Sequence, residues 1–236
     1  MADGRFTDRL LEENRDTWDA AVTHRFIREL FAGTLPDDVM LSYLVQDYRF
    51  VDGFMALLGA AVATADNYAS RRRLAEFIGE VAGDENTYFV EALEELGAGG
   101  GDGAGNLEAV PDTASTAGFR RIFAEAAGTG NYAAIVSVLV VCEWLYLDWA
   151  TRGSNRAVAP EGNGGYPSRH VHAEWVRLHD YPAFHDLVAF LRDEVDRAAT
   201  CSPGDGEMAR EYFRRTVELE LAFFTEILPE SGPGTR

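Results

Sequence analysis

The chain has 236 residues, of which 47% are hydrophobic and 25% charged, a balance typical of a folded globular protein. Its 39 acidic residues outnumber its 21 basic residues, which are all arginine, and the formal net charge is −18. A surface of this sign repels phosphate groups, so we expect neither nucleic acid nor a membrane as a partner. So much acid without lysine favours a halophilic source, because concentrated salt screens the self-repulsion of such a surface.

The N-terminal sequence, the longest apolar run and the number of cysteines predict where in the cell the protein is located. The N-terminus, MADGRFTDRLLEENRD, has neither a basic start nor an apolar core, so we expect no signal peptide. The longest apolar run, Tyr132 to Cys142, is too short to cross a bilayer. Two cysteines, Cys142 and Cys201, are too few for a disulfide scaffold, and we interpret Cys201 as structural or exposed. These features predict a cytoplasmic protein.

Helical periodicity dominates the chain, and no stretch alternates as a strand would. Pro36-Asp37-Asp38 places acidic residues at the start of one helix, and Pro229 ends the last one. The pattern predicts helices at about 6–20, 23–33, 37–66, 69–97, 113–127, 131–152, 169–178, 182–200 and 206–228. We therefore predict an all-α protein with a single domain over residues 1–236.

Three further segments are less informative. The glycine-rich segment 97–106, GAGGGDGAGN, lacks the context of a phosphate-binding loop, and we interpret it as a flexible insertion. The segment 152–167 is predicted to be a second long loop, which could shape the rim of a pocket. The basic run 71–73 is interpreted as a solvated helix face.

Acidic side chains interrupt two apolar helix faces. Asp47 lies in the middle of a stripe with helical spacing that consists of Met40, Leu44, Val51, Phe54 and Leu58. Glu220 interrupts a second stripe in the same way, whereas Glu218 and Glu226 lie off that stripe and are predicted to be solvated. A buried carboxylate must find a donor or take up a proton, so Asp47 is either a satisfied core residue or part of a site.

The helix predicted at 131–152 is apolar nearly all round, which is typical of a central buried helix. It contains Cys142, Glu143 and Tyr146, which are neighbours at helical spacing. We expect Asp47, Glu143 and Glu220 to converge on one interior cavity, because acids with perturbed pKa values in a pocket are typical of functional sites. Such a cavity favours a small polar ligand that is neutral or cationic.

At these residues the sequence resembles the TenA family, the thiaminase II group of the haem-oxygenase-like all-α fold. The resemblance covers roughly residues 17–228 and depends on three blocks, LSYLVQDYRFVDGF around Asp47, VCEWLY from Cys142 to Tyr146, and VELELAFF around Glu220. It implies a single-domain haem-oxygenase-like helical bundle that hydrolyses 5-aminomethyl-2-methylpyrimidin-4-amine, or its formyl derivative, to the hydroxymethylpyrimidine for thiamin salvage. It also implies a homotetramer, and it implies no cofactor and no metal.

The resemblance assigns roles to individual residues. Asp47 would hold the aminopyrimidine edge, Cys142 would be the nucleophile, Glu220 would handle protons, and Tyr146 would contact the pyrimidine. Three positions depart from the branch of the family that uses cysteine, where tyrosines are expected: Phe50, Phe119, and His172 in the HAEW block that ends at Trp175. The QDYxFV block and the Glu143-x-x-Tyr146 spacing instead resemble a second branch, which relies on a glutamate.

The chain thus carries both Cys142 and Glu143, and two mechanisms are open. A thiolate could add to the ring and help to expel the amine, or a glutamate could activate water directly. We favour shared acid and base work by Glu143 and Glu220, with Cys142 assisting or lining the pocket. The predicted substrate-binding residues are Asp47, Phe50, Tyr146, Phe119, His172 and Trp175.

Two other functions remain open. Proteins with this fold include di-iron and cofactorless oxidases, and iron would need histidines and carboxylates at ligand spacing. His172 and His179 could share a helix face and Asp84-Glu85 offers carboxylates elsewhere, but no H-E-x-x-H or paired E-x-x-H motif is present. A pyrimidine-binding protein without turnover is the other alternative, because the missing phenols would have oriented the ring.

Overall fold

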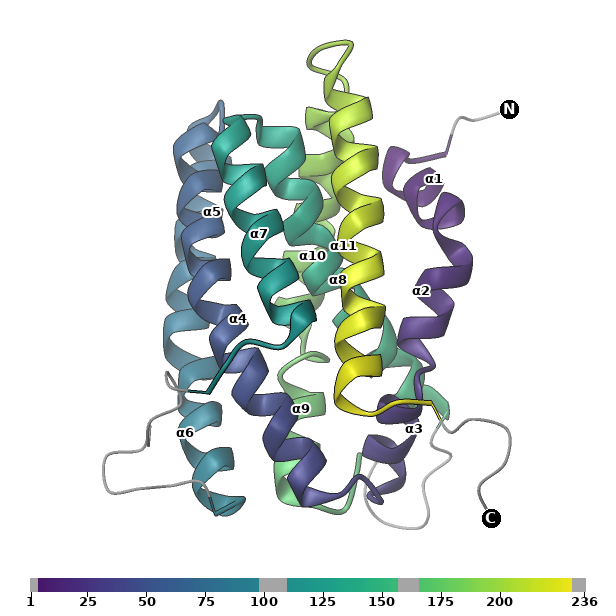
Figure 1. The fold of residues 1–236 in the computed structure, drawn as a ribbon. Helices are drawn as coiled ribbons and strands as arrows, with labels where there is room; N and C mark the ends of the chain where they lie inside the picture. The colour runs from purple at the N-terminus through teal and green to yellow at the C-terminus, as the bar shows by residue number, and fades with distance from the viewer. Residues whose placement is uncertain (1–3, 98–109, 157–165, 231–236) are drawn as a thin grey trace.

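The computed structural model describes residues 4–97, 110–156 and 166–230, and all regular structure in these ranges is helical (Figure 1). This confirms the predicted all-α fold. The elements are α1 (Phe6–Glu13), α2 (Arg15–Val22), α3 (Arg25–Ala32), α4 (Asp37–Thr64), α5 (Tyr68–Glu80), the π-helical turn η1 (Val81–Glu85), α6 (Asn86–Glu95), α7 (Ala114–Thr129), α8 (Tyr132–Arg156), α9 (His170–Arg177), α10 (Pro182–Ala198) and α11 (Asp205–Ile227).

Two predicted helices are divided in the structure. The segment 6–20 consists of α1 and α2, which meet at Asn14. The Asn14 amide donates a hydrogen bond to the carbonyl of Leu10 over 2.8 Å, and such side-chain bonds compete with the helical backbone pattern. The segment 69–97 consists of α5, η1 and α6, in which the widened π-helical turn separates two α-helices.

Local signals explain where several helices begin and end. Asn67 accepts a hydrogen bond from the backbone N–H of Ser70 and so caps α5, and Thr113 caps α7 in the same way. Gly130 ends α7 with φ at 61°, in the left-handed region that glycine adopts without steric cost. These residues explain why the helix ends were predictable to within a few residues.

Helix α8 lies at the centre of the fold and packs against α11, α10, α4 and α7 (Figure 1). By length and hydropathy its segment Tyr132–Gly153 could cross a membrane, contrary to the expectation from the shorter apolar run, but 78% of its most apolar stretch is buried by the surrounding helices. Buried hydrophobic residues from α1 to α11 form one cluster around it. A single domain over residues 1–236 is compatible with this cluster and stays a prediction.

The predicted loops lie mostly outside the described residues. This applies to the glycine-rich segment 97–106 beyond Gly97 and to 157–165 of the second loop. Helix α8 continues to Arg156, so the loop predicted from residue 152 begins later than expected. In the basic run, Arg71 and Arg72 are exposed as predicted, whereas Arg73 is half-buried and forms an ion pair with Glu80.

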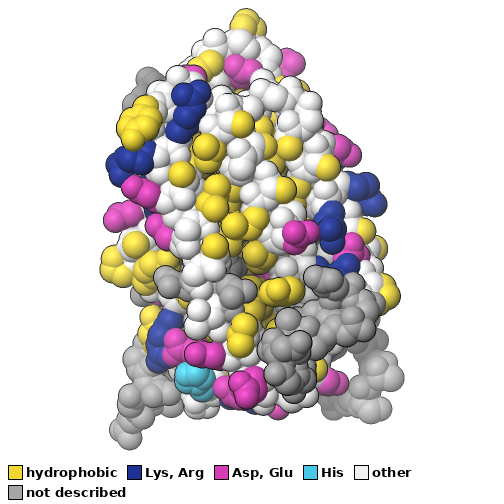
Figure 2. Space-filling view, turned by 90° about the vertical axis from the view of Figure 1, so that its left-hand side faces the viewer, with side chains coloured by type: hydrophobic (Ala, Val, Ile, Leu, Met, Phe, Trp, Pro, Cys, Tyr) yellow, Lys and Arg dark blue, Asp and Glu magenta, His cyan; other side chains and the backbone are white. Residues whose placement is uncertain are grey.

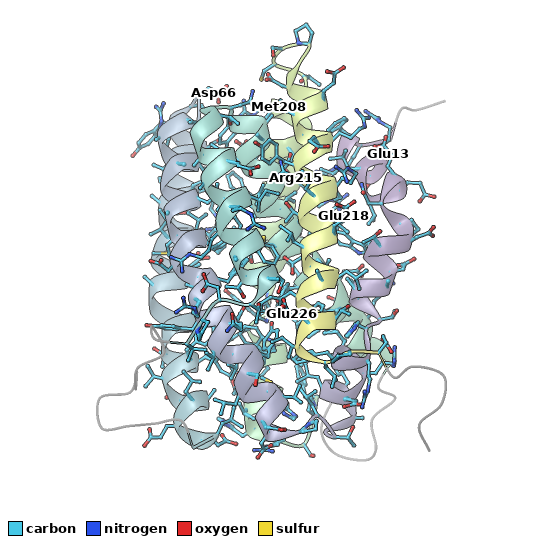
Figure 3. All side chains as sticks on the ribbon, in the orientation of Figure 1. Glu13, Asp66, Met208, Arg215, Glu218 and Glu226 are labelled. Carbon is cyan, nitrogen blue, oxygen red and sulfur yellow. The ribbon has the colours of Figure 1, made fainter. Side chains whose placement is uncertain are left out.

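The surface is less uniform than the net charge suggests. Figure 2 shows the face formed by α5 and α6, where hydrophobic side chains form a band and charged side chains lie toward the edges. Tyr68 of α5 and Val90 of α6 are exposed hydrophobic residues. Figure 3 shows Glu218 and Glu226 along α11. Both are exposed, as predicted, and Glu226 also accepts hydrogen bonds from Ala114 and Ser115 at the start of α7.

Candidate active site

A pocket lies between α4, α5, α8, α9 and the start of α10, and we call it the acidic pocket. Its cavity has a volume of about 60 Å³, which leaves room for several water molecules. Aromatic side chains and carboxylates from these elements share its wall. Its lining residues are Asp47, Phe50, Phe54, Phe77, Glu80, Val81, Cys142, Glu143, Tyr146, Trp175, Leu178, His179, Tyr181 and Phe184.

The α4 wall of the pocket carries Asp47 and Phe50, which lie one helical turn apart. Asp47 is only 5% exposed, as its place in the apolar stripe predicted. The Phe50 ring packs edge-on against the ring of Phe119 on α7, with the ring centres 4.9 Å apart. Phe119 therefore supports Phe50 from behind and does not itself line the pocket.

The α8 wall carries Cys142, Glu143 and Tyr146, which the helical spacing placed together. Cys142 and Tyr146 are buried, and Glu143 is half-buried. Behind Cys142 lies Glu220 of α11, whose carboxyl group accepts a hydrogen bond from the thiol. Glu220 is 2% exposed and does not line the pocket, so Cys142 stands between it and the cavity.

Burial has opposite consequences for the reactivity of Glu220 and Cys142. Loss of hydration raises the pKa of Glu220 to about 8, so its carboxyl group carries a proton at neutral pH. Its Oε1 atom is buried without a hydrogen-bond partner among the described residues, an arrangement that costs less free energy for a neutral carboxyl group than for an ionised one. Burial, followed by the charges of Glu220 and Glu143, also raises the pKa of the Cys142 thiol. The thiol is therefore a poor nucleophile until a base removes its proton.

A pair of tyrosines connects the two walls. The hydroxyl groups of Tyr43 on α4 and Tyr146 on α8 are 2.8 Å apart and share a hydrogen bond. Burial raises the pKa of Tyr146, and the charges of Asp47 and Glu220 act on it in the same direction. Both carboxyl groups thus act on one phenol, but Glu220 does not line the pocket, so only Asp47 and Glu143 of the three acids predicted to converge on one cavity reach it.

The α9 wall differs from the sequence prediction. Trp175 lines the pocket, whereas His172 does not. The ring of His172 is fully buried, neither of its nitrogen atoms has a hydrogen-bond partner in the part of the chain that the structure describes, and burial lowers its pKa to about 4. His172 is thus a neutral core residue, and the structure does not bring it to the other predicted site residues.

Sequence reasoning considered His179 only as a possible iron ligand and missed it as a residue of this pocket, which it lines just after α9 ends. Its ring packs against Trp175 and Tyr146, with ring centres 4.5 and 4.9 Å away. The Nδ1 atom lies 2.7 Å from the carbonyl of Trp175, and burial lowers the pKa of the ring to about 4. A neutral ring that donates from Nδ1 has Nε2 free as an acceptor. Its spacing of four residues from Trp175 is the signal that could have found it.

Glu80 and Tyr181 were also missed, because neither interrupts an apolar stripe. Within the described ranges, no group of three or more His, Cys, Asp or Glu side chains is arranged to hold a metal ion. The arrangement that is present can bind a small polar heterocycle between aromatic rings and can move protons beside it.

Comparisons with known proteins identify the family of the chain. Residues 11–229 match the profile of the TENA/THI-4/PQQC family. An aminopyrimidine aminohydrolase of Halalkalibacterium halodurans is 20% identical over 220 residues, which cover 93% of each chain.

Solved structures with the same fold are described as TenA proteins. The TenA homologue of P. horikoshii OT3 is 22% identical with a TM-score of 0.80, over 95% of this chain and 98% of that one. A TenA family transcription regulator from Silicibacter sp. TM1040 is 21% identical with a TM-score of 0.79, over 96% and 98% of the two chains. The helical arrangement is thus the haem-oxygenase-like one that the resemblance implied, and the chain belongs to the TENA/THI-4/PQQC family.

Proposed function

We propose that this protein is a C–N hydrolase of the thiaminase II or aminopyrimidine aminohydrolase type. Its substrate would be 5-aminomethyl-2-methylpyrimidin-4-amine or the formyl derivative, and its product the hydroxymethylpyrimidine, which thiamin salvage reuses. The observation that carries this proposal is the position of Cys142, with Glu143 beside it on the pocket wall and Glu220 hydrogen-bonded behind it. The name of the relative from H. halodurans supports the same class of reaction.

Asp47 is the proposed anchor of the substrate ring. An aminopyrimidine presents an amino donor next to a ring-nitrogen acceptor, and a carboxyl group that shares a proton matches both. The buried position of Asp47 favours such sharing, because an apolar environment disfavours the fully charged form. Phe50, Tyr146 and Trp175 supply aromatic surfaces around the ring.

Glu143 and Glu220 are the proposed proton-transfer groups. Glu143 takes a proton from a water molecule while the water oxygen bonds to the exocyclic methylene carbon. The C–N bond breaks with its electron pair remaining on nitrogen, and an ammonium leaving group departs as ammonia. A neutral formylamine needs a proton as it leaves. The Cys142 S–H turns from Glu220 and gives its proton to the departing nitrogen, and Glu220, which is protonated at neutral pH, gives its own proton to the sulfur. Cys142 would then pass on this proton or only form part of the pocket wall, because formation of its own thiolate is disfavoured.

The test compares three single variants, Cys142→Ser, Glu143→Gln and Glu220→Gln, in ammonia release from the aminomethylpyrimidine. We expect Glu143→Gln to lose about 100-fold or more in kcat with this substrate, and Glu220→Gln to lose as much in formamide release from the formyl derivative, whose leaving group needs a proton. The serine variant should lose less. Full activity in both glutamine variants would contradict the proposed mechanism. Loss in the serine variant alone would indicate the thiol mechanism. Glu218→Gln, an exposed change on the same helix as Glu220, is the matched control.

A pyrimidine-binding protein without turnover is the second candidate. Phe50 and Phe119 stand where the cysteine branch has tyrosines, and neither can hold a water by hydrogen bonding. Calorimetric binding of the hydroxymethylpyrimidine by a wild-type protein that releases no ammonia would favour this candidate over the hydrolase.

Three properties of the whole protein complete the proposal. We propose a cytoplasmic homotetramer from a halophilic organism, on the basis of the family resemblance for the assembly and of the −18 net charge for the source. Sedimentation equilibrium at low and high salt tests the assembly, and a monomer at both would contradict it.

A further inference from the structure

The hydrolysis proposed above makes no use of a carboxylate at the more open end of the acidic pocket. Glu80 is the last residue of α5 and lines the pocket together with Phe77, three residues earlier on the same helix face, and Val81, the first residue of η1. Its side chain is 35% exposed, whereas Asp47 and Cys142 are almost completely buried. The pocket is therefore most buried at Asp47 and Cys142 and more open at Glu80, and Glu143, like Glu80, is half-buried.

The backbone and an ion pair set the position of Glu80. The π-helical turn η1 begins at the next residue, Val81, and single π-helical turns within α-helices occur frequently at functional sites. Arg73 lies seven residues earlier on α5, about two helical turns away, and its Nη1 donates a hydrogen bond to Glu80 Oε1 over 3.1 Å. Among the described residues, Oε2 of Glu80 makes no hydrogen bond. The carboxylate is therefore held in place with one oxygen available to a ligand.

The charges around the pocket favour a cation at this end. Asp47, Glu80 and Glu143 all line the pocket, and no arginine is among its lining residues. The one histidine in the lining, His179, is neutral at physiological pH because burial lowers its pKa to about 4. A primary amine on the exocyclic methylene carries a positive charge at neutral pH, whereas a formylamine and a hydroxyl group do not.

We propose that Glu80 is a specificity-determining residue that selects substrates with a cationic leaving group, of the alkylammonium or thiazolium class. This inference rests on the proposed function, in which Asp47 holds the ring at the buried end. The leaving group must depart into solvent, so it faces the open end, where the free oxygen of Glu80 binds its charge. A half-exposed ion pair contributes modestly to the free energy of binding, so we expect Glu80 to favour the cationic ligand over the neutral one about fivefold.

Calorimetric titration at pH 7 tests this without requiring turnover. The ligands are the cationic 5-aminomethyl-2-methylpyrimidin-4-amine, with data taken before conversion, and the neutral hydroxymethylpyrimidine, which has the same ring. We expect Glu80→Gln to weaken binding of the cation about fivefold and to leave binding of the neutral ligand unchanged. Glu76→Gln, which removes the same charge one turn earlier on the exposed side of α5, should change neither.

Two further comparisons separate attraction by Glu80 from repulsion by Arg73 and from a structural role of Glu80. Glu80→Gln also leaves Arg73 unpaired, so the double variant with Arg73→Gln removes that repulsion. A persistent loss for the cation supports attraction by Glu80, and full recovery overturns it. Equal weakening of both ligands indicates a structural role and also overturns the inference. Wild-type protein that binds both ligands without ammonia release contradicts the proposed hydrolysis, while the binding ratio still decides the role of Glu80.

Discussion

Glu220 illustrates how one buried side chain ties stability to pH. The proposed role requires a carboxyl group that holds a proton at neutral pH, and burial provides it. The thiol that hydrogen-bonds to this carboxyl group, Cys142, is itself neutral. The same burial costs free energy once the proton is lost, because an ionised carboxylate in an apolar site is poorly solvated. The residue that would perform the proton transfer is therefore also one that destabilises the fold at high pH.

The pKa of Glu220 predicts the sign of this effect. The folded chain holds a proton up to about pH 8, whereas the unfolded chain releases it near 4.5. The stabilisation is thus fully present below about pH 4.5 and is lost as the pH rises through about 8. We expect the free energy of unfolding of the wild type, relative to Glu220→Gln, to fall by about 1 kcal/mol per pH unit in this window. Urea titrations from pH 5 to 9 measure it, and a flat difference would contradict it.

The two cysteines predict a difference in reactivity. Cys142 is buried with a raised thiol pKa, and Cys201 is exposed. We expect iodoacetamide at pH 7.5 to modify native protein once, at Cys201, and to modify urea-unfolded protein twice. Mass spectrometry of tryptic peptides checks the sites. Rapid labelling of Cys142 in the native protein would contradict the buried thiol and would favour the nucleophilic role instead.

At the scale of helices, close approaches fix how the elements of the bundle pack. Gly153 of α8 lies directly against Phe31 of α3, and a Cβ atom at this position would come within 2.0 Å of the ring. The Phe31 ring in turn packs edge-on against Trp149, a large buried residue of α8. The glycine therefore allows α3 to lie against the central helix, close to the helical turns that carry the site.

A pair of glycine substitutions tests this packing. Gly153→Ala should destabilise the protein by about 1–3 kcal/mol, because the Phe31 ring has to move out of a packed position. Gly59→Ala is the matched control, since no atom lies within 4 Å of its added Cβ in α4. The control should be neutral or stabilise by up to about 1 kcal/mol through helix propensity. Chemical denaturation measures both, and equal effects would contradict the close approach.

At the scale of the whole molecule, like charges outnumber the ion pairs that offset them. The 39 acidic residues exceed the 21 arginines by 18, so many carboxylates have no basic partner even though surface pairs such as Arg210–Glu13 and Arg214–Glu218 form. Salt weakens both the repulsion and these pairs, but exposed pairs contribute little. The net effect of added salt is therefore expected to stabilise the fold.

The expected result is a Tm that rises by about 4 °C or more between 0.1 and 2 M KCl, which corresponds to about 1–2 kcal/mol for a protein of this size. Differential scanning calorimetry measures this rise. Sucrose at matched osmolality is the control, because it strengthens burial without screening charge, and it should raise the Tm less. A Tm that stays constant or falls in KCl would contradict both the charge argument and the halophilic proposal.

The sequence by itself determined the helices and much of the site. Apolar periodicity does not depend on the partner helix, so the all-α fold and the approximate helix bounds followed from it. Asp47 and Glu220 were found because an acid inside an apolar stripe is conspicuous, and Cys142, Glu143 and Tyr146 because helical spacing makes them neighbours. The single domain and the roles of these residues stay predictions.

Only the tertiary structure decided which other side chains reach the pocket. His172 and His179 look equivalent in the sequence, yet the first is buried in the core and the second lines the pocket, because α9 ends between them and the chain turns. In the sequence Glu80 looks like an ordinary surface acid, and only the packing of α8 and α10 around the same pocket shows that it lines a site. Sequence periodicity fixes which residues share a helix face, but the environment of that face depends on residues far away in the chain.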